Sequence, residues 1–123
     1  MKVAFTTSSG VRIDGSFRNA NDFTIWDITR TETNYVSTVS IIKDPQTADD
    51  RIRIRADALA GCALLCTNEI NGPANARLNA RNIRVLKFIR RTSVEEIIVN
   101  LQEALQGTPP AWMKKTANSS VLD

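Results

Sequence analysis

A wholly apolar run of five residues, CALLC, extends from Cys62 to Cys66, between Gly61 and a polar stretch that begins at Thr67. A strand that carries no polar side chain is buried on both faces, as the inner strands of parallel sheets are. Gly61 is suited to the left-handed position that ends a preceding helix. The run therefore predicts the centre of a sheet in an α/β protein.

The residue patterns around this run predict an alternation of strands and helices. Apolar and β-branched residues predict strands at 1–7, 23–28, 35–42, 62–66 and 83–88. Helical spacing and capping signals predict helices at 49–60, 71–81 and 93–107. Because a hairpin of the second and third strands precedes alternating units, we expect an α/β fold with a mixed five-stranded sheet and about three helices.

Two of these helices differ in how clearly they are marked. The segment RIRIR at 51–55 alternates like a strand, but Ile52, Ala56 and Leu59 follow helical spacing and the alanine-rich RADALA favours a helix. We therefore predict a helix there. The helix at 93–107 starts with a capping box of Ser93 and Glu96, and apolar residues fill one stripe of it.

Composition indicates one domain of 1–115 with a loosely ordered polar tail at 116–123. The chain has no run of the roughly 20 apolar residues that cross a bilayer, and its first ten residues lack the apolar core of an export signal. Two cysteines without such a signal indicate a reducing compartment, so we expect a cytoplasmic protein with free thiols. The net charge of +3 is too small and too scattered for a nucleic-acid interface, so neither nucleic acid nor membrane is an expected partner.

The chain contains no histidine. Triads that use a histidine base and metal sites that use imidazole are therefore excluded for this chain alone. If the run from Cys62 to Cys66 is fully extended, the two thiols share one face about 13 Å apart and cannot hold one ion together. Cys62 then has the character of a core residue, whereas Cys66, beside a polar loop, is either a core residue or a thiolate ligand.

Carboxylates at Asp14, Asp22 and Asp27 allow the alternative of a magnesium-dependent nuclease, against the simpler interpretation that they cap turns or face solvent. The turn at Ser8, Ser9 and Gly10 lacks the lysine and the spacing of a phosphate-binding loop. Ligands of such sheets bind at the carboxyl ends of the strands. Residues 7–10 and 66–69 are therefore the candidate rim of a site.

Several segments, taken in order, resemble the NifX-like family of nitrogenase cofactor-binding proteins over residues 1–115. They are MKVAFTTSSG, DGSF with FTIWDI, GCALLCTNEINGPANARL, IRVLKF and EEIIVNLQEALQGTPPAWMKK. The resemblance implies a ribonuclease H-like α/β fold. It also implies a small carrier, not an enzyme, that transiently binds an iron-sulfur precursor or the finished iron-molybdenum cofactor and works with nitrogenase cofactor-assembly proteins.

The family's first loop usually reads Asp-x-His-Phe-Gly, and its histidine is a candidate cofactor contact. Here Asp14 and Phe17 match, while Ser16 and Arg18 stand where the histidine and the glycine would be. The resemblance therefore implies a site of similar shape without imidazole ligation. Its expected cofactor-binding residues are Ser8, Ser9, Ser16, Arg18, Cys66, Asn71 and Gly72, with Cys66 as the candidate metal ligand.

A physical argument independent of the family supports anion contacts. Iron-sulfur clusters with thiolate or organic-acid ligands are net anions, so Arg18 and the amides of the helix that starts near Asn71 could stabilise one. Two alternatives stay open. One is a cofactor-free interaction or regulatory module of nitrogen fixation that uses Phe17 and Trp112, and the other is a nucleic-acid domain of ribonuclease H type.

Overall fold

The structure is a computed structural model that describes residues 1–107. The predicted tail at 116–123 and the segment that contains Trp112 lie outside these residues. The elements are β1 (Lys2–Thr6), β2 (Asp22–Ile28), β3 (Thr33–Ser40), α1 (Ala48–Ala58), β4 (Leu64–Thr67), α2 (Gly72–Ala80), β5 (Arg84–Lys87) and α3 (Val94–Gln106). Each predicted strand and helix is therefore present, with ends displaced by a few residues.

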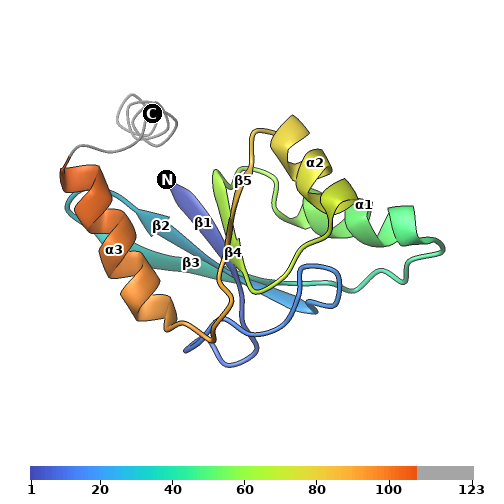
Figure 1. The fold of residues 1–123 in the computed structure, drawn as a ribbon, viewed down its shortest axis with the longest axis horizontal. Helices are drawn as coiled ribbons and strands as arrows, with labels where there is room; N and C mark the ends of the chain where they lie inside the picture. Colours follow the sequence, from blue (N-terminus) through green and yellow to red (C-terminus); the bar gives the residue numbers. More distant parts are fainter. Residues whose placement is uncertain (108–123) are drawn as a thin grey trace.

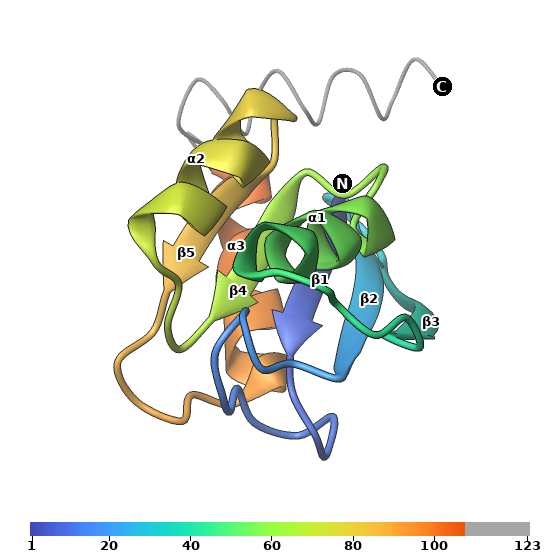
Figure 2. The same cartoon turned by 90° about the vertical axis from the view of Figure 1, so that its right-hand side faces the viewer.

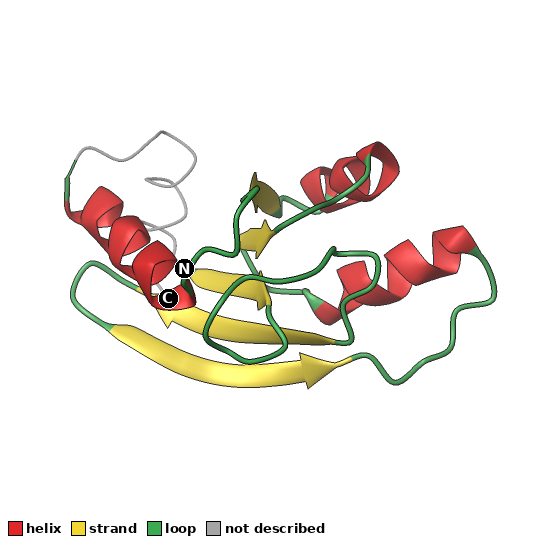
Figure 3. Ribbon diagram, turned by 60° about the horizontal axis from the view of Figure 1, so that its bottom comes forward, coloured by secondary structure: helices red, strands yellow, loops and turns green. Residues whose placement is uncertain are grey.

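The five strands form one open sheet in the order β3-β2-β1-β4-β5 (Figure 1). β1, β4 and β5 are parallel, whereas β2 pairs antiparallel with both β1 and β3. The prediction of an α/β fold with a mixed five-stranded sheet and three helices is confirmed. β3 is the longest strand and lies at the outer edge of the sheet (Figure 3).

Helices cover both faces of the sheet, with α3 on one side and α1 and α2 on the other (Figures 1 and 2). Each side has its own apolar core. Leu64 and Cys66 belong to the core on the α3 side, and Leu65 belongs to the core on the α1/α2 side. All four residues of β4 are buried, so the prediction that the CALLC run contains a strand buried on both faces is confirmed. The prediction that this strand is the sheet centre is wrong, because the β2–β3 hairpin pairs on the far side of β1 and makes β1 the central strand.

Local signals in the sequence explain where the helices form. α3 starts at the predicted cap, where the Ser93 hydroxyl accepts a hydrogen bond from the Glu96 backbone N–H at 3.3 Å. Its apolar stripe is buried against the sheet. α1 starts after Thr47, whose hydroxyl accepts from Asp50 N–H at 3.0 Å, so the RIRIR segment is helical as predicted. Within residues 1–107 no helix combines the length and the apolar character that a membrane span requires.

The expectation that Cys62 and Cys66 share one face is wrong. Cys62 lies in the core on the α1/α2 side, whereas Cys66 lies in the core on the α3 side. The physical reason is the turn at Gly61, which has a φ of +88°. In that turn Cys62 N–H donates to Leu59 C=O, and the strand begins only at Leu64. The alternation of side chains along a strand therefore does not extend back to Cys62.

Candidate functional site at the carboxyl ends of the parallel strands

Three loops meet where the parallel strands end. They are the β1–β2 loop (7–21), the β4–α2 loop (68–71) and the β5–α3 loop (88–93), and we call them together the rim. Figure 2 shows them at one end of the sheet, the lower end in that view. Because carboxyl ends of parallel strands are the usual ligand-binding edge of an α/β sheet, the rim is the candidate site.

Backbone hydrogen bonds tie the three loops to one another. Ile13 N–H donates to Thr92 C=O at 2.8 Å, and Val94 N–H donates to Val11 C=O at 2.9 Å. Phe17 N–H donates to Glu69 C=O at 2.9 Å. The β1–β2 loop is thus joined to both of the other loops, so their relative positions are fixed without a ligand.

Two apolar side chains anchor the β1–β2 loop, one on each side of the sheet. Ile13 is fully buried in the core on the α3 side, and Phe17 is fully buried in the core on the α1/α2 side. The Phe17 ring lies 5.9 Å from the ring of Phe23. The expectation that Phe17 serves an exposed interaction surface is therefore wrong, because this side chain holds the loop onto the sheet.

The conformation of the loop DGSF depends on Asp14 and Gly15. The Asp14 carboxylate accepts from Ser8 N–H at 3.0 Å and from the Ser8 hydroxyl at 2.7 Å. Gly15 has a φ of +77°, a conformation that side chains with a Cβ rarely adopt. The hydroxyl proton of Ser8 is thus already donated, so Ser8 shapes the loop and has no further proton to offer a ligand.

The other two candidate hydroxyls retain their donors. Ser9 Oγ accepts from Val11 N–H at 3.1 Å, and Ser16 Oγ accepts from Asn19 N–H at 3.2 Å. A hydroxyl that accepts one hydrogen bond can still donate its own proton. Ser9 and Ser16 can therefore each donate to a ligand at the rim.

Arg18 is exposed and its backbone is supported by α1. Its carbonyl accepts from Arg51 Nη1 at 3.5 Å. Two residues further on, the carbonyl of Ala20 accepts from Nε of Arg55, which is only 4% exposed, at 3.1 Å. Burial, and secondarily the charge of Arg51, lowers the pKa of Arg55. These contacts fix the backbone that carries Arg18, while its exposed guanidinium faces solvent.

Asn71 and Gly72 lie at the start of α2, beside a hollow of about 270 Å³ that Lys87 and Val85 also line. Asn71 Oδ1 caps the helix by accepting from Ala74 N–H at 2.8 Å, and Pro73 has no N–H. The amide of Gly72 is therefore the donor that the first turn can offer, and Gly72 lines this hollow. Ser8 and Asp14 line a different hollow of about 170 Å³, so the predicted residues share one edge but not one cavity.

Cys66 lies below the rim in the core. It is fully buried, and burial raises the pKa of its thiol well above the ordinary value. Burial likewise raises the pKa of the Cys62 thiol to about 11. Since a thiolate rather than a thiol ligates metal, both environments disfavour the ligating form. Residues 1–107 contain no group of three or more Cys, Asp or Glu side chains placed to hold a metal ion.

The three carboxylates of the magnesium alternative do not converge. Asp14 is tied to Ser8, and Asp22 at the start of β2 accepts from the Ser40 hydroxyl at 2.6 Å. Asp27 lies five residues further along β2, which corresponds to about 17 Å of extended strand. The arrangement of these residues therefore does not support a two-metal nuclease site.

Arginines outside the predicted set of site residues also lie on the rim. Arg12 donates from Nη1 to Arg91 C=O at 3.2 Å, and the exposed Arg90 and Arg91 belong to the β5–α3 loop. The three loops together contain four arginines and two carboxylates. Arg90 and Arg91 closely follow the predicted strand at 83–88, which is the one sequence signal for them. Only the folded chain brings residue 12 beside residue 91.

The side chain of Asn68 holds the β5–α3 loop, which lies about twenty residues further along the chain. Its Nδ2 donates to Phe88 C=O at 2.8 Å and to Arg90 C=O at 3.1 Å. Just below, the buried hydroxyls of Thr6 and Thr67 are joined at 3.0 Å across the ends of β1 and β4. The fold and the rim together define a small α/β domain whose exposed site groups are mainly arginines, hydroxyls and amides, with the carboxylate of Glu69 beside them.

Comparison with known proteins then identifies the family. Residues 1–104 match the family described as dinitrogenase iron-molybdenum cofactor, and the chain belongs to this family. The chain is 31% identical over 118 residues to protein NifY of Azotobacter vinelandii, a match that covers 94% of this chain and 47% of that protein. It is 30% identical over 117 residues to protein NifX of Herbaspirillum seropedicae, with 94% and 80% covered.

A further NifX protein, from Sinorhizobium fredii, is 27% identical over 122 residues and is covered to 76% of its length. The chain thus spans about half of the NifY relative and about three quarters or more of these NifX relatives. Among solved structures, a putative NifB protein from Thermotoga matches with a TM-score of 0.57 and 22% identity, covering 85% of this chain and 89% of that one. That likeness supports the fold.

Proposed function

We propose that this protein takes part in handling the nitrogenase iron-molybdenum cofactor. More specifically, we propose that it carries an iron-sulfur precursor of that cofactor, or the finished cofactor, between assembly proteins in the cytoplasm. Membership of the dinitrogenase iron-molybdenum cofactor family supports the general role. The observation that carries the specific role is the cationic rim, whose loops are already tied together.

The chemistry of the rim suits an anionic cluster. Hydrogen bonds from charged donors to anions are stronger than neutral ones, and Arg18 offers such donors at an exposed position. Ser9, Ser16 and the amide of Gly72 add neutral donors around the same edge. In this proposal Ser8 and Asn71 act by fixing the loop and the helix start, because their own groups are already used.

Binding of this kind also suits release. A cluster held by charge and hydrogen bonds leaves more readily than one held by a set of thiolate ligands, and the cargo leaves chemically unchanged. The protein would thus act as a carrier rather than as an enzyme. Ligation by Cys66 stays a prediction, but it would require a buried thiol to lose its proton and to emerge from the core.

Anaerobic incubation with extracted iron-molybdenum cofactor, followed by gel filtration and measurement of molybdenum and iron per protein, tests the proposal. We expect wild type to retain cofactor and Arg18→Ala to retain it several-fold less tightly. The matched control is Arg53→Ala, because Arg53 is an exposed arginine of α1 that pairs with Asp50 at 3.3 Å. If wild type retains no metal, or if both variants lose it equally, the proposal fails.

Purification of the protein from nitrogen-fixing cells distinguishes the carrier proposal from the alternative of a cofactor-free interaction module. The carrier proposal predicts that assembly proteins and cofactor metals are recovered together with the protein. Recovery of assembly proteins without molybdenum or iron would support instead a cofactor-free module.

A further inference from the structure

The outer edge of β3 has no partner strand among residues 1–107. Natural edge strands are usually blunted by charges, prolines or short length, because a row of free backbone groups pairs readily with another strand. β3 is eight residues long, and the sequence from Thr33 to Ile42 contains no charged residue and no proline. Tyr35, Val36 and Ile42 along this edge are 54%, 44% and 89% exposed.

The backbone groups that point away from β2 can be assigned from the register. Ile41 N–H donates to Asn21 C=O, so the groups of alternate residues, those of Thr38 and Ser40, point outward. At the other end, Thr29 N–H donates to Glu32 C=O. The same alternation there turns the groups of Thr33 and Tyr35 outward.

An irregularity separates these two sets of outward groups. Between Ile25 and Trp26 of β2 the register shifts, so that Val36 is an extra residue on β3. Tyr35 and Thr38 consequently lie on the same face, where the Tyr35 hydroxyl and the Thr38 hydroxyl are 2.8 Å apart. A regular strand could match one set of outward groups but would be out of phase with the other.

We propose that a second copy of this chain pairs with β3, antiparallel and about a twofold axis between Val36 and Ser37. In this register Tyr35 lies opposite Thr38 of the second copy, and Thr33 lies opposite Ser40 of the second copy. Each outward-pointing residue then meets another outward-pointing residue, because both strands carry the same irregularity at the axis. The result is a ten-stranded sheet with isologous pairing.

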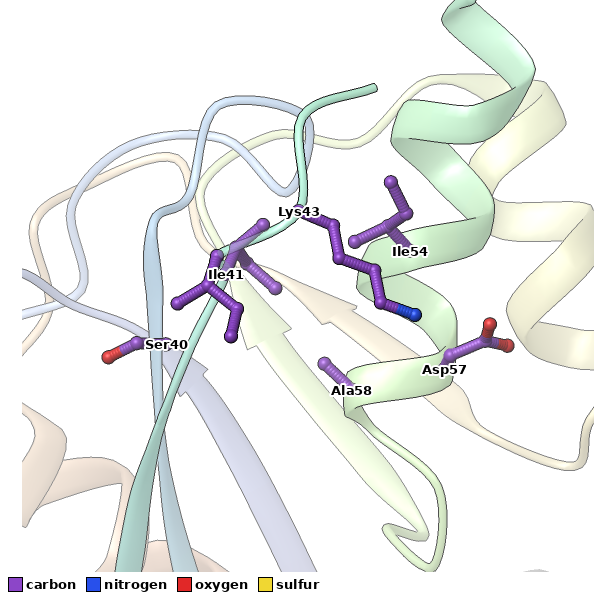
Figure 4. Close-up of a pocket in the computed structure, with 7 residues that line it drawn as sticks. Ser40, Ile41, Lys43, Ile54, Asp57 and Ala58 are labelled. Carbon is purple, nitrogen blue, oxygen red and sulfur yellow. The ribbon is translucent and has the colours of Figure 1, made fainter. Parts of the chain in front are cut away.

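The end of β3 beyond Ser40 carries charged side chains that already have partners within the chain. Beyond Ser40, a hollow of about 230 Å³ between the end of β3 and α1 is lined by Lys43 and Asp57, and Lys43 extends toward Asp57 (Figure 4). A hydrogen bond from Arg81, at 2.6 Å, is the main cause that lowers the pKa of Asp57. In the proposed register Thr33 of the second copy lies opposite Ser40, so the turn of the second copy that precedes Thr33 falls near this end of β3.

The pairing leaves the candidate site accessible. β3 is at one edge of the sheet, and β5, which carries the arginine-rich loop, is at the other. Pairing along one strand buries little area compared with stable dimers, so we expect a weak, concentration-dependent dimer with a dissociation constant of roughly micromolar order.

Sedimentation velocity of the full chain from about 5 to 500 µM tests the pairing. We expect a monomer–dimer equilibrium that Thr38→Pro abolishes, because proline removes an outward N–H and leaves the bonds to β2 in place. Thr38→Ala keeps the N–H and should still dimerise. Val36→Lys should weaken the dimer at least tenfold, whereas the control Val99→Lys, on the exposed face of α3, should not.

Amide hydrogen exchange identifies the occupant of the edge. We expect the amides of Tyr35 and Thr38 to become protected as protein concentration rises. A protein that stays monomeric at 500 µM overturns the proposal, as does a dimer that tolerates both Thr38→Pro and Val36→Lys. Protection of these amides that is independent of concentration would assign the edge to a segment of the same chain and would overturn it as well.

Discussion

The strand β4 and the rim directly after it follow opposite rules. Leu64 to Thr67 are all buried, whereas Glu69 and Asn71, a few residues later, are exposed. The strand is fixed by apolar burial on both faces, and the rim is fixed by hydrogen bonds between loops that are distant in sequence. The difference teaches that stability resides in the buried strands, while the proposed binding groups are exposed side chains that contribute little to stability.

The largest expected effect comes from a cavity in the core beside β4. Leu64→Ala should lower the free energy of unfolding by about 3 kcal/mol, because it removes a fully buried side chain from the core on the α3 side. Chemical denaturation followed by circular dichroism measures the change. A loss below about 1 kcal/mol would mean that burial of β4 contributes little to the stability of the fold.

Asn68 connects the two regions, so its removal should have an intermediate effect. Asn68→Ala deletes the side-chain donor to Phe88 C=O and Arg90 C=O and should cost about 1–2 kcal/mol. Hydrogen exchange should become faster in the β5–α3 loop and stay unchanged in β4. Uniformly faster exchange across the sheet would show that the rim and the core are not separate.

Replacement of Cys62 should have a smaller effect on the free energy of unfolding than Leu64→Ala, and this effect should depend on pH. Burial raises the pKa of its thiol from 9.0 to about 11, so the stability linked to the protonated thiol is complete below about pH 9. This part is lost as the pH rises toward 11, because the unfolded chain releases the proton more readily. The difference in unfolding free energy between wild type and Cys62→Ala should therefore shrink over this range, by roughly 2 kcal/mol. An unchanged difference would contradict the assignment.

The core could be predicted from sequence because buried residues follow local patterns of apolar side chains. The CALLC run, the stripe of α3 and the Ser93 cap each identify an element without knowledge of the rest of the chain. The face of Cys62 was missed because the strand starts two residues later, after a turn at Gly61. A periodic pattern predicts which face of a sheet a side chain lies on only when the ends of the strand are known.

The rim could be predicted only in part. The rule that ligands bind at the carboxyl ends of strands selected residues 7–10 and 66–69, and the structure places these residues at the ends of the parallel strands β1 and β4. The contact between residues 13 and 92 depends on the whole fold and has no local signal, so the arginines of the β5–α3 loop were missed. Phe17 was placed on the surface because its loop is polar, whereas the open end of the sheet needs an apolar side chain to close it.

The central claim is that the rim would hold its cargo by charge and hydrogen bonds rather than through Cys66. The most direct measurement compares anaerobic retention of extracted iron-molybdenum cofactor by two variants, each first checked for an intact fold by circular dichroism. The account predicts that the combined variant Arg18→Ala, Arg90→Ala and Arg91→Ala binds at least tenfold more weakly, with a reduced dependence on salt. It predicts that Cys66→Ala binds within about threefold of wild type. Loss of binding in Cys66→Ala, together with wild-type binding by the arginine variant, would contradict the account.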